Sequence, residues 1–130
     1  MRSEVSGSFT AIAVPDSWDQ IGTELSVKGF DVLGLLSKYT KGAEDGVQIR
    51  VMGKLISGSS DKWQLGVWKA NAAGDTMDAL AQILEIESTQ NAPPANFDVT
   101  AVNYVDIEVQ MKGSTTPDGT IDMSWIKTCS

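Results

Sequence analysis

Apolar and polar residues alternate in several segments of this chain. In the clearest one, residues 97–111, the odd positions are mostly apolar and the even positions mostly polar. Side chains of a β-strand point alternately to the two faces of a sheet, so this period is typical of a strand with one buried face. The run exceeds the usual length of a strand, and polar Asn103 stands on its apolar side. We therefore expect a bend or a break at Asn103.

The same alternation predicts further strands along the chain. It runs through residues 21–27, 47–55, 63–67 and 121–125. Nearly continuous apolar runs at residues 9–14 and 30–36 are also better strands than helices. Gly53 falls in the buried register of its strand, and a glycine there marks a bulge or a close approach of another segment. In all, roughly seven or eight short strands are expected.

Turn-forming residues join the last two of these strands. The segment reads Gly113-Ser-Thr-Thr-Pro-Asp-Gly119. Proline, aspartate and glycine follow one another here in the order that a reverse turn prefers. We expect the two strands to form an antiparallel hairpin.

One segment has a helical pattern instead. Apolar residues recur at helical spacing between Asp75, which can cap a helix, and Glu87. These residues are Met77, Leu80, Ala81 and Leu84. A short helix is predicted near residues 76–86, and an extended strand is the alternative for the same stretch.

The many short strands predict a mainly β fold. Two antiparallel sheets can each bury one face against the other, which gives a two-layer β-sandwich, and a jelly roll is one form of it. The 130 residues are close to the commonest size of one domain and long enough to bury a sizeable core. We therefore expect residues 1–130 to form a single β-sandwich domain.

Charge and hydropathy limit the partners of the chain. Ten basic and 17 acidic residues give a net charge of −7, and the basic residues are scattered singly. No basic patch that would neutralise successive phosphates is present, so we expect no direct contact with nucleic acid. The longest apolar run, residues 32–36, is far shorter than the ~20 residues of a membrane helix. Residues 1–4 do not begin a secretory signal, so neither a membrane partner nor secretion is expected.

Little in the sequence indicates catalysis. The chain contains no histidine and one cysteine, Cys129, so triads with a histidine base and thiolate metal sites cannot form. Paired carboxylates remain, because glycosidases need only two. Asp106 and Glu108 share one strand face, as do Asp118 and Asp122, and we interpret all four as residues of a solvated sheet face. We predict no catalytic residue, no cofactor, no metal site, a free thiol at Cys129, and a protein that is not an enzyme.

The predicted polar faces carry large apolar residues. These are Ile12, Phe30, Met52, Ile56, Trp68, Val102, Tyr104 and Ile126. A small domain rarely leaves that much apolar surface in water, so we expect partners to cover some of it. Short arms at residues 1–9 and 124–130 can also reach neighbours at little cost to folding. The predicted interface contains Phe9, Trp68, Val102, Tyr104, Trp125 and Ile126.

Four tryptophans support an alternative function. Aromatic rings on one surface stack against sugars, so the protein is alternatively a carbohydrate-binding or host-attachment module. Trp63 and Trp68 have opposite parity in one strand, and Trp18 lies in a turn-rich stretch. Nothing in the sequence places these rings on a common face, and packing in the core or at an interface also accounts for them.

As a whole, the chain resembles small β-sandwich or jelly-roll structural proteins of bacteriophage virions, of the capsid decoration type. The likeness lies in the overall character of the chain, which is short, acidic and histidine-free and has strands rich in Ser, Thr and Gly. It includes the closing segment Lys112-Gly-Ser-Thr-Thr-Pro-Asp-Gly-Thr-Ile121, followed by Trp125-Ile126-Lys127.

This resemblance implies a non-enzymatic subunit that stabilises a viral shell. Such a subunit self-associates, often as a homotrimer, and binds a major capsid protein or another virion protein. It is synthesised in the host cytoplasm and resides in the virion. Tail, neck and fibre proteins share the same architecture and are alternatives.

Overall fold

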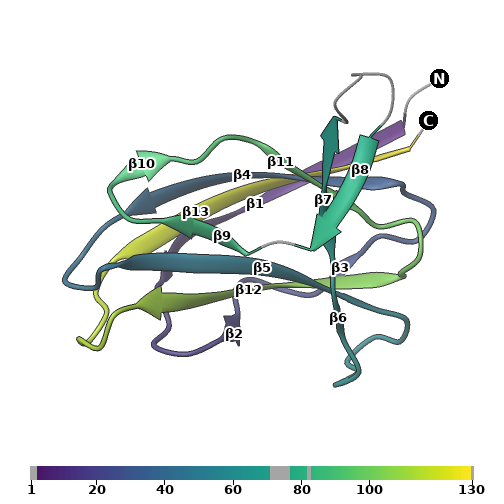
Figure 1. Cartoon of the computed structure of the whole chain (residues 1–130). Coiled ribbons are helices and arrows are strands. Elements are labelled where there is room, and N and C mark those ends of the chain that lie inside the picture. Colours follow the sequence, from purple (N-terminus) through teal and green to yellow (C-terminus); the bar gives the residue numbers. More distant parts are fainter. Residues whose placement is uncertain (1–2, 71–76, 82, 130) are drawn as a thin grey trace.

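The computed structural model describes residues 3–70, 77–81 and 83–129. Within these ranges the chain forms thirteen strands and no helix (Figure 1). The strands are β1 (Ser3–Ala13), β2 (Asp19–Gln20), β3 (Leu25–Ser26), β4 (Val32–Thr40), β5 (Gly46–Lys54), β6 (Trp63–Gln64), β7 (Gly66–Ala70), β8 (Met77–Ala81), β9 (Leu84–Ile86), β10 (Gln90–Asn91), β11 (Ala95–Asp98), β12 (Tyr104–Lys112) and β13 (Thr120–Cys129). Because this described part contains no helix, it contains no helix that could span a membrane.

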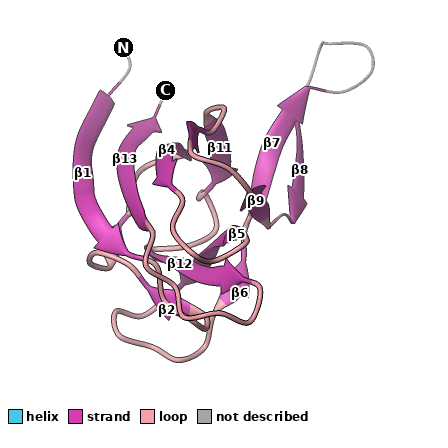
Figure 2. Cartoon of the chain, turned by 90° about the vertical axis from the view of Figure 1, so that its left-hand side faces the viewer, coloured by secondary structure: helices cyan, strands magenta, loops and turns pink. Residues whose placement is uncertain are grey.

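Two antiparallel sheets pack against each other (Figure 2). The first has the order β1-β13-β4-β11-β7-β8, with β10 beside β4. The second has the order β2-β12-β5-β6, with β3 beside β12 and β9 beside β5. Strands β1, β4, β11 and β13 lie in one sheet and β2, β5, β9 and β12 in the other, interleaved as in a jelly roll. The predicted β-sandwich is confirmed.

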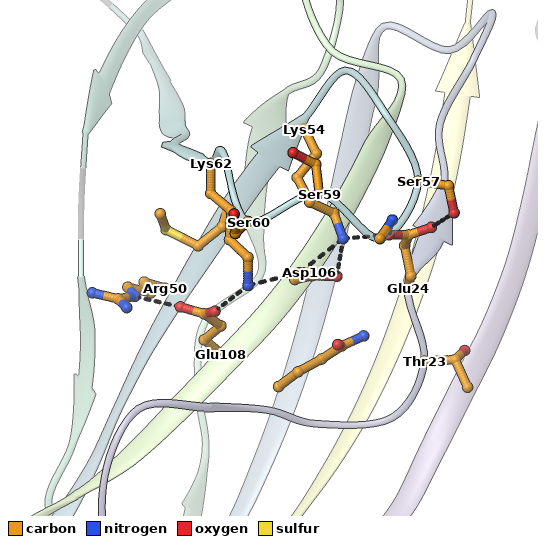
Figure 3. Close-up of a pocket in the computed structure, with 13 residues that line it drawn as sticks. Thr23, Glu24, Arg50, Lys54, Ser57, Ser59, Ser60, Lys62, Asp106 and Glu108 are labelled. Carbon is orange, nitrogen blue, oxygen red and sulfur yellow. Dashed lines mark hydrogen bonds and ion pairs between the residues drawn. The ribbon is translucent and has the colours of Figure 1, made fainter.

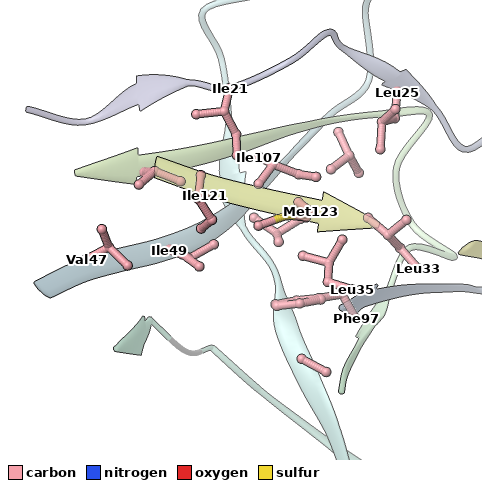
Figure 4. Close-up of a cluster of buried hydrophobic side chains, with 14 of the residues drawn as sticks. Ile21, Leu25, Leu33, Leu35, Val47, Ile49, Phe97, Ile107, Ile121 and Met123 are labelled. Carbon is pink, nitrogen blue, oxygen red and sulfur yellow. The ribbon is translucent and has the colours of Figure 1, made fainter. Parts of the chain in front are cut away.

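Alternate residues of the long central strands fill the space between the sheets (Figure 4). Most of the fully buried side chains come from β4, β5, β11, β12 and β13. They include Leu33, Leu35, Val47, Ile49, Val51, Phe97, Val105, Ile107, Val109, Ile121 and Met123. Burying one such aliphatic side chain contributes about 1.5–3 kcal/mol, so this alternation is the main source of stability.

The chain changes sheets at Asn103, where the sequence pattern predicts a break. Strand β11 ends at Asp98 in the first sheet, and β12 begins at Tyr104 in the second. The Asn103 side chain donates a hydrogen bond to the Leu55 carbonyl at 3.0 Å, and its backbone N–H donates to the Lys54 carbonyl at 2.9 Å. The prediction is confirmed, because the polar residue ties the crossing segment to the end of β5.

Gly53 confirms the predicted close approach of another segment. A Cβ at this position would lie 2.7 Å from Cγ1 of Val102 and 2.9 Å from Cδ2 of Leu65. Val102 fills the space over the glycine and is only 8% exposed. The prediction that Val102 faces solvent is therefore wrong, because the turn before β12 folds this side chain inward.

The predicted hairpin between the last two strands is also wrong. Strand β12 pairs with β5, whereas β13 pairs with β4 and β1. Each of the two strands has one apolar face, and those faces meet across the interior of the sandwich. Residues 113–119 therefore cross from one sheet to the other.

No helix forms in the described part of residues 76–86. Met77–Ala81 pairs with β7 as β8, and Leu84–Ile86 pairs with β5 as β9. A short apolar run with helical spacing also fits a strand, and here the backbones of β7 and β5 provide partners for it. Asp75, the expected capping residue, lies outside the described residues.

Candidate functional site

A depression of about 1000 Å³ lies on the outer face of the second sheet (Figure 3). Its floor is formed by outward-facing side chains of β5 and β12, and its walls by residues 20–24 and 57–62. Six charged residues line it, and we call them the charged network: Glu24, Arg50, Lys54, Lys62, Asp106 and Glu108.

Lys54 links one half of the charged network. Its Nζ lies 3.0 Å from Oδ1 of Asp106 and also donates a hydrogen bond to Glu24. Lys54 is only 3% exposed and Asp106 only 2%. Glu24 in turn accepts hydrogen bonds from the backbone N–H of Gly58, at 2.8 Å, and from the hydroxyl of Ser57. The loop after β5 is thereby held to the segment between β2 and β3.

Lys62 and Arg50 complete the other half. The Nζ of Lys62 lies 3.0 Å from Oδ2 of Asp106 and 2.9 Å from Oε2 of Glu108. The Nε of Arg50 donates to Oε1 of Glu108 at 2.8 Å, and its guanidinium lies 4.1 Å from the centre of the Trp18 ring. Three carboxylates and three cations thus balance one another.

The strand register explains why these groups meet. In the ladder between β12 and β5, Glu108 lies opposite Arg50, and Asp106 lies two residues away on the same face. Side chains directly opposite in an antiparallel pair are close enough to interact. The expectation that Asp106 and Glu108 are solvated is wrong, since both are buried under the loops that carry Glu24 and Lys62.

The pKa values of the acids are held low. The backbone N–H of Gly58 and the side chains of Lys54 and Ser57 lower the pKa of Glu24 to about 2. Burial raises the pKa of Glu108, but hydrogen bonds from Lys62 and Arg50 outweigh it, and the net change is downward.

The two lysines shift in the opposite direction. The hydrogen bond to Glu108 raises the pKa of Lys62. Burial lowers the pKa of Lys54, but the hydrogen bonds to Glu24 and Asp106 outweigh it and raise the net value. A general acid or base works best with a pKa near the working pH. These shifts move the pKa values of the two glutamates and the two lysines further from pH 7. The geometry favours a network that holds loops in place.

Among the described residues, no three Cys, Asp or Glu side chains are grouped to hold a metal ion.

A buried carboxylate outside the charged network, Glu44, joins two loops at the opposite end of the strands. Its Oε1 accepts hydrogen bonds from the backbone N–H groups of Asp118, at 3.0 Å, and Gly119, at 2.8 Å. Its Oε2 accepts one from Gly42 N–H at 2.7 Å and one from the hydroxyl of Tyr39. We call this arrangement the Glu44 clasp.

The clasp keeps Glu44 ionised inside the protein. Burial raises the pKa of this carboxyl, but hydrogen bonds from Tyr39, Gly42, Gly119 and Asp118 outweigh it and lower the pKa to about 2. A carboxylate that accepts several N–H bonds is stabilised in its charged form. The sequence offers no signal for this role, because the donors belong to two segments far apart along the chain, residues 39–42 and 118–119.

Apolar side chains are exposed at the end of the sandwich near the β5–β6 loop. Leu55, Ile56 and Trp63 are exposed, and Ile56 reaches 71%. A cavity of about 250 Å³ lies beside them, and its lining is almost entirely apolar. The cavity is lined by Leu55, Trp63, Leu65, Ala101 and Val102. We call these five residues and Ile56 the apolar end.

The residues of the predicted interface lie at several places. Phe9 and Trp125 are half-buried and pack against the core from the first sheet. Tyr104 is half-buried on the outer face of the second sheet, with the Nζ of Lys28 5.2 Å from its ring centre. Ile126 is half-buried on the first sheet beside Gly34. Their contact with a partner stays a prediction.

Of the same predicted set, Val102 belongs to the apolar end, and the side chain of Trp68 lies outside what is described. The tryptophans with described side chains also lie apart. Trp18 stacks on Arg50, Trp63 lies at the apolar end, and Trp125 packs on the core. Cys129, in the last strand, is half-buried with a free thiol.

Comparison with known proteins links the chain to others through its fold alone. No protein-family model matches the sequence, and no curated protein matches it. The solved structure of the SPBc2 prophage-derived protein YomS is similar, with a TM-score of 0.56 and 17% identity over 99% of this chain and 96% of that chain. The PBSX exported protein XepA has a TM-score of 0.54 and 16% identity over 98% of this chain, which spans 39% of XepA. The chain therefore shares the β-sandwich fold of the prophage-derived protein YomS along nearly the whole length of both.

Proposed function

We propose that this protein is a non-enzymatic structural subunit of a bacteriophage particle, and more specifically a capsid decoration protein. The observation that carries the proposal is the shared fold, which spans 99% of this chain and 96% of a protein described as prophage-derived. The short, acidic, histidine-free sequence agrees with it.

The geometry of the charged network supports the non-enzymatic part of the proposal. Each of its three carboxylates is hydrogen-bonded to at least one cation. A glycosidase needs one carboxyl with a raised pKa to protonate the leaving group. Glu24 and Glu108 instead have lowered pKa values, and Asp106 contacts two lysines.

The apolar end supports attachment to other proteins. Exposed apolar patches with polar surroundings mark protein interaction sites, and Ile56 and Trp63 protrude beside a cavity that an apolar side chain can enter. In a decoration protein, each copy would contribute a modest contact with the shell and with its neighbours. Many such contacts add through multivalency and stabilise the shell against internal pressure.

Particle composition tests the proposal directly. If the gene lies among phage structural genes, mass spectrometry of purified particles should detect the protein, and shells that lack it should bind the purified chain on co-sedimentation. The substitution Ile56→Lys should weaken this binding about tenfold or more, because it places a charge at the most exposed large apolar residue of the apolar end. Leu36→Lys is the matched control, since Leu36 is exposed on the other sheet.

Other results point to the alternatives. Detection only in tails or necks would assign the protein to those structures in place of the shell. Absence from particles, together with binding to a glycan array, would contradict the proposal in favour of the carbohydrate-binding function.

A further inference from the structure

Strand β1 forms one edge of the first sheet (Figure 2). It pairs with β13 on one side, and no strand of the described ranges lies on its other side. An edge strand presents a row of backbone N–H and C=O groups that can pair with another extended chain. The backbone of β1 can therefore accept another extended strand.

Before the bulge that follows Phe9, the sequence of β1 lacks the features that usually block such pairing. Edge strands are commonly protected by lysines, prolines or short length. Strand β1 spans 11 residues, contains no proline and no lysine, and carries one charge, Glu4. Residues 6–8 are Ser, Gly and Ser, so no bulky side chain of β1 stands beside the edge there.

A β-bulge limits the part of β1 that can pair. The register with β13 is continuous from Ser3 to Phe9 and shifts between Phe9 and Ile12. Ala11 in this bulge has a φ of 53°, and its N–H donates to Asp122 at 2.6 Å. Bulges twist an edge away from a regular ladder, so residues 3–9 are the available stretch.

We propose that a second copy of this chain pairs with this edge, β1 against β1 in antiparallel orientation, about a twofold axis at Ser6. Residues 3–9 are centred on Ser6, so full overlap of two such stretches places Ser6 opposite Ser6 of the second copy. The same register places Val5 opposite Gly7. In this symmetric pairing each off-axis contact occurs twice, because both copies use the same patch of surface.

The side chains are complementary in this register. Val5 is 46% exposed, and the Trp125 ring lies over Gly7, with Cε2 only 2.8 Å from where a Cβ would be. Residues opposite each other in an antiparallel pair share a face. Val5 of each copy is therefore directed toward Gly7 and the edge of the Trp125 ring that covers it.

The charges agree with the same register. Glu4 lies opposite Ser8, so the two Glu4 carboxylates are not paired with each other across the ladder. Like charges directly opposite would destabilise the pair. The single charge on β1 thus selects the antiparallel arrangement over a parallel one in register, which would set Glu4 beside Glu4.

This inference rests on the self-association that the proposed function includes. It identifies the edge of β1 as the surface through which two copies contact each other. A twofold contact produces dimers, in place of the trimer that the resemblance implies. Particle membership is measured separately, so a failure of the edge assignment is distinguishable from a failure of the proposed function.

Disulfide trapping tests the register. Both variants carry Cys129→Ser, and one adds Ser6→Cys while the matched control adds Ser8→Cys on the same face of the same strand. At the axis the two Cα atoms would be about 4.5–5.5 Å apart, within disulfide reach. Two Ser8 positions would be displaced by four residues, roughly 13 Å along the strand, and out of reach. We expect at least tenfold more covalent dimer with Ser6→Cys. Equal yields, or no dimer from either variant, would overturn the proposal.

Light scattering on the unmodified chain and on Val5→Lys gives the second test. We expect a dimer mass for the former and a dissociation constant raised about 100-fold by the substitution, because two apolar contacts are replaced by charges. Ile83→Lys, at an exposed apolar position just before β9 of the second sheet, should leave the constant unchanged, and circular dichroism should show the same fold for all three proteins. A trimer mass, or a mass that Val5→Lys does not change, would overturn the edge assignment alone. A monomer at every concentration would overturn self-association as well.

Discussion

Asp106 illustrates how the surroundings of one residue decide its role. It occupies a polar position of an alternating strand, yet it is only 2% exposed and contacts both Lys54 and Lys62. Buried ion pairs cost desolvation energy and contribute little net stability, but removal of one partner leaves an uncompensated buried charge. The network therefore ties the loops to the sheet more than it adds to the free energy of folding.

The substitution Asp106→Asn should lower the free energy of unfolding by about 3 kcal/mol, because Lys54 stays buried without its full complement of negative charge. Urea titration monitored by tryptophan fluorescence measures the change. The control is Asp16→Asn, at an exposed position, for which we expect less than about 0.5 kcal/mol. Equal effects of the two substitutions would refute the structural role of the network.

At the scale of elements, two loops depend on one carboxylate. The Glu44 clasp joins the β4–β5 connection to residues 118 and 119, which precede β13. The jelly-roll order places β4 and β5 in different sheets, and likewise β12 and β13, so neither connection joins two strands that pair with each other. The Glu44 carboxylate supplies hydrogen-bond acceptors for backbone N–H groups of both connections.

The clasp should make stability depend on pH. Because the pKa of Glu44 is lowered to about 2, its contribution is fully present above about pH 5 and is lost as the pH falls toward 2. Glu44→Gln should lower the free energy of unfolding at pH 7 by roughly 2 kcal/mol. Urea titrations at several pH values should show the difference between the two proteins shrinking as the pH falls.

Glu87→Gln is the matched control for that experiment, since Glu87 is exposed and pairs only with Lys112 among the described ion pairs. We expect it to change the free energy of unfolding by less than about 0.5 kcal/mol at either pH. A difference between wild type and Glu44→Gln that grows on acidification would contradict the assigned role of the clasp.

At the scale of the whole molecule, neither sheet is a separate unit. Among the described strands, the chain crosses between the sheets after β1, β3, β4, β6, β8, β9, β11 and β12, and both sheets contribute to one core. A strand that leaves its sheet would expose apolar residues of the other sheet as well. This connectivity favours a single cooperative unit of folding.

We therefore expect one unfolding transition. Far-ultraviolet circular dichroism and tryptophan fluorescence should give coincident urea curves, as they do for small two-state domains. Fluorescence reports on all four tryptophans, of which Trp18, Trp63 and Trp125 lie at separate places in the fold. Two separated transitions would show that the sheets unfold independently and would contradict the prediction of one domain.

Local patterning was enough to predict the β-sandwich. The face to which a strand side chain points depends only on its position along the strand. The sequence therefore predicted the core positions of β5 and β12, the break at Asn103 and the close approach at Gly53. Tertiary structure decided the rest. The sheet that each strand joins, the strands at Met77–Ala81 and Leu84–Ile86, and the inward turn of Val102 depend on the segments packed against them. Asp106 is buried because it pairs with Lys54, 52 positions away, and contacts between such distant residues leave no periodic signal in the sequence.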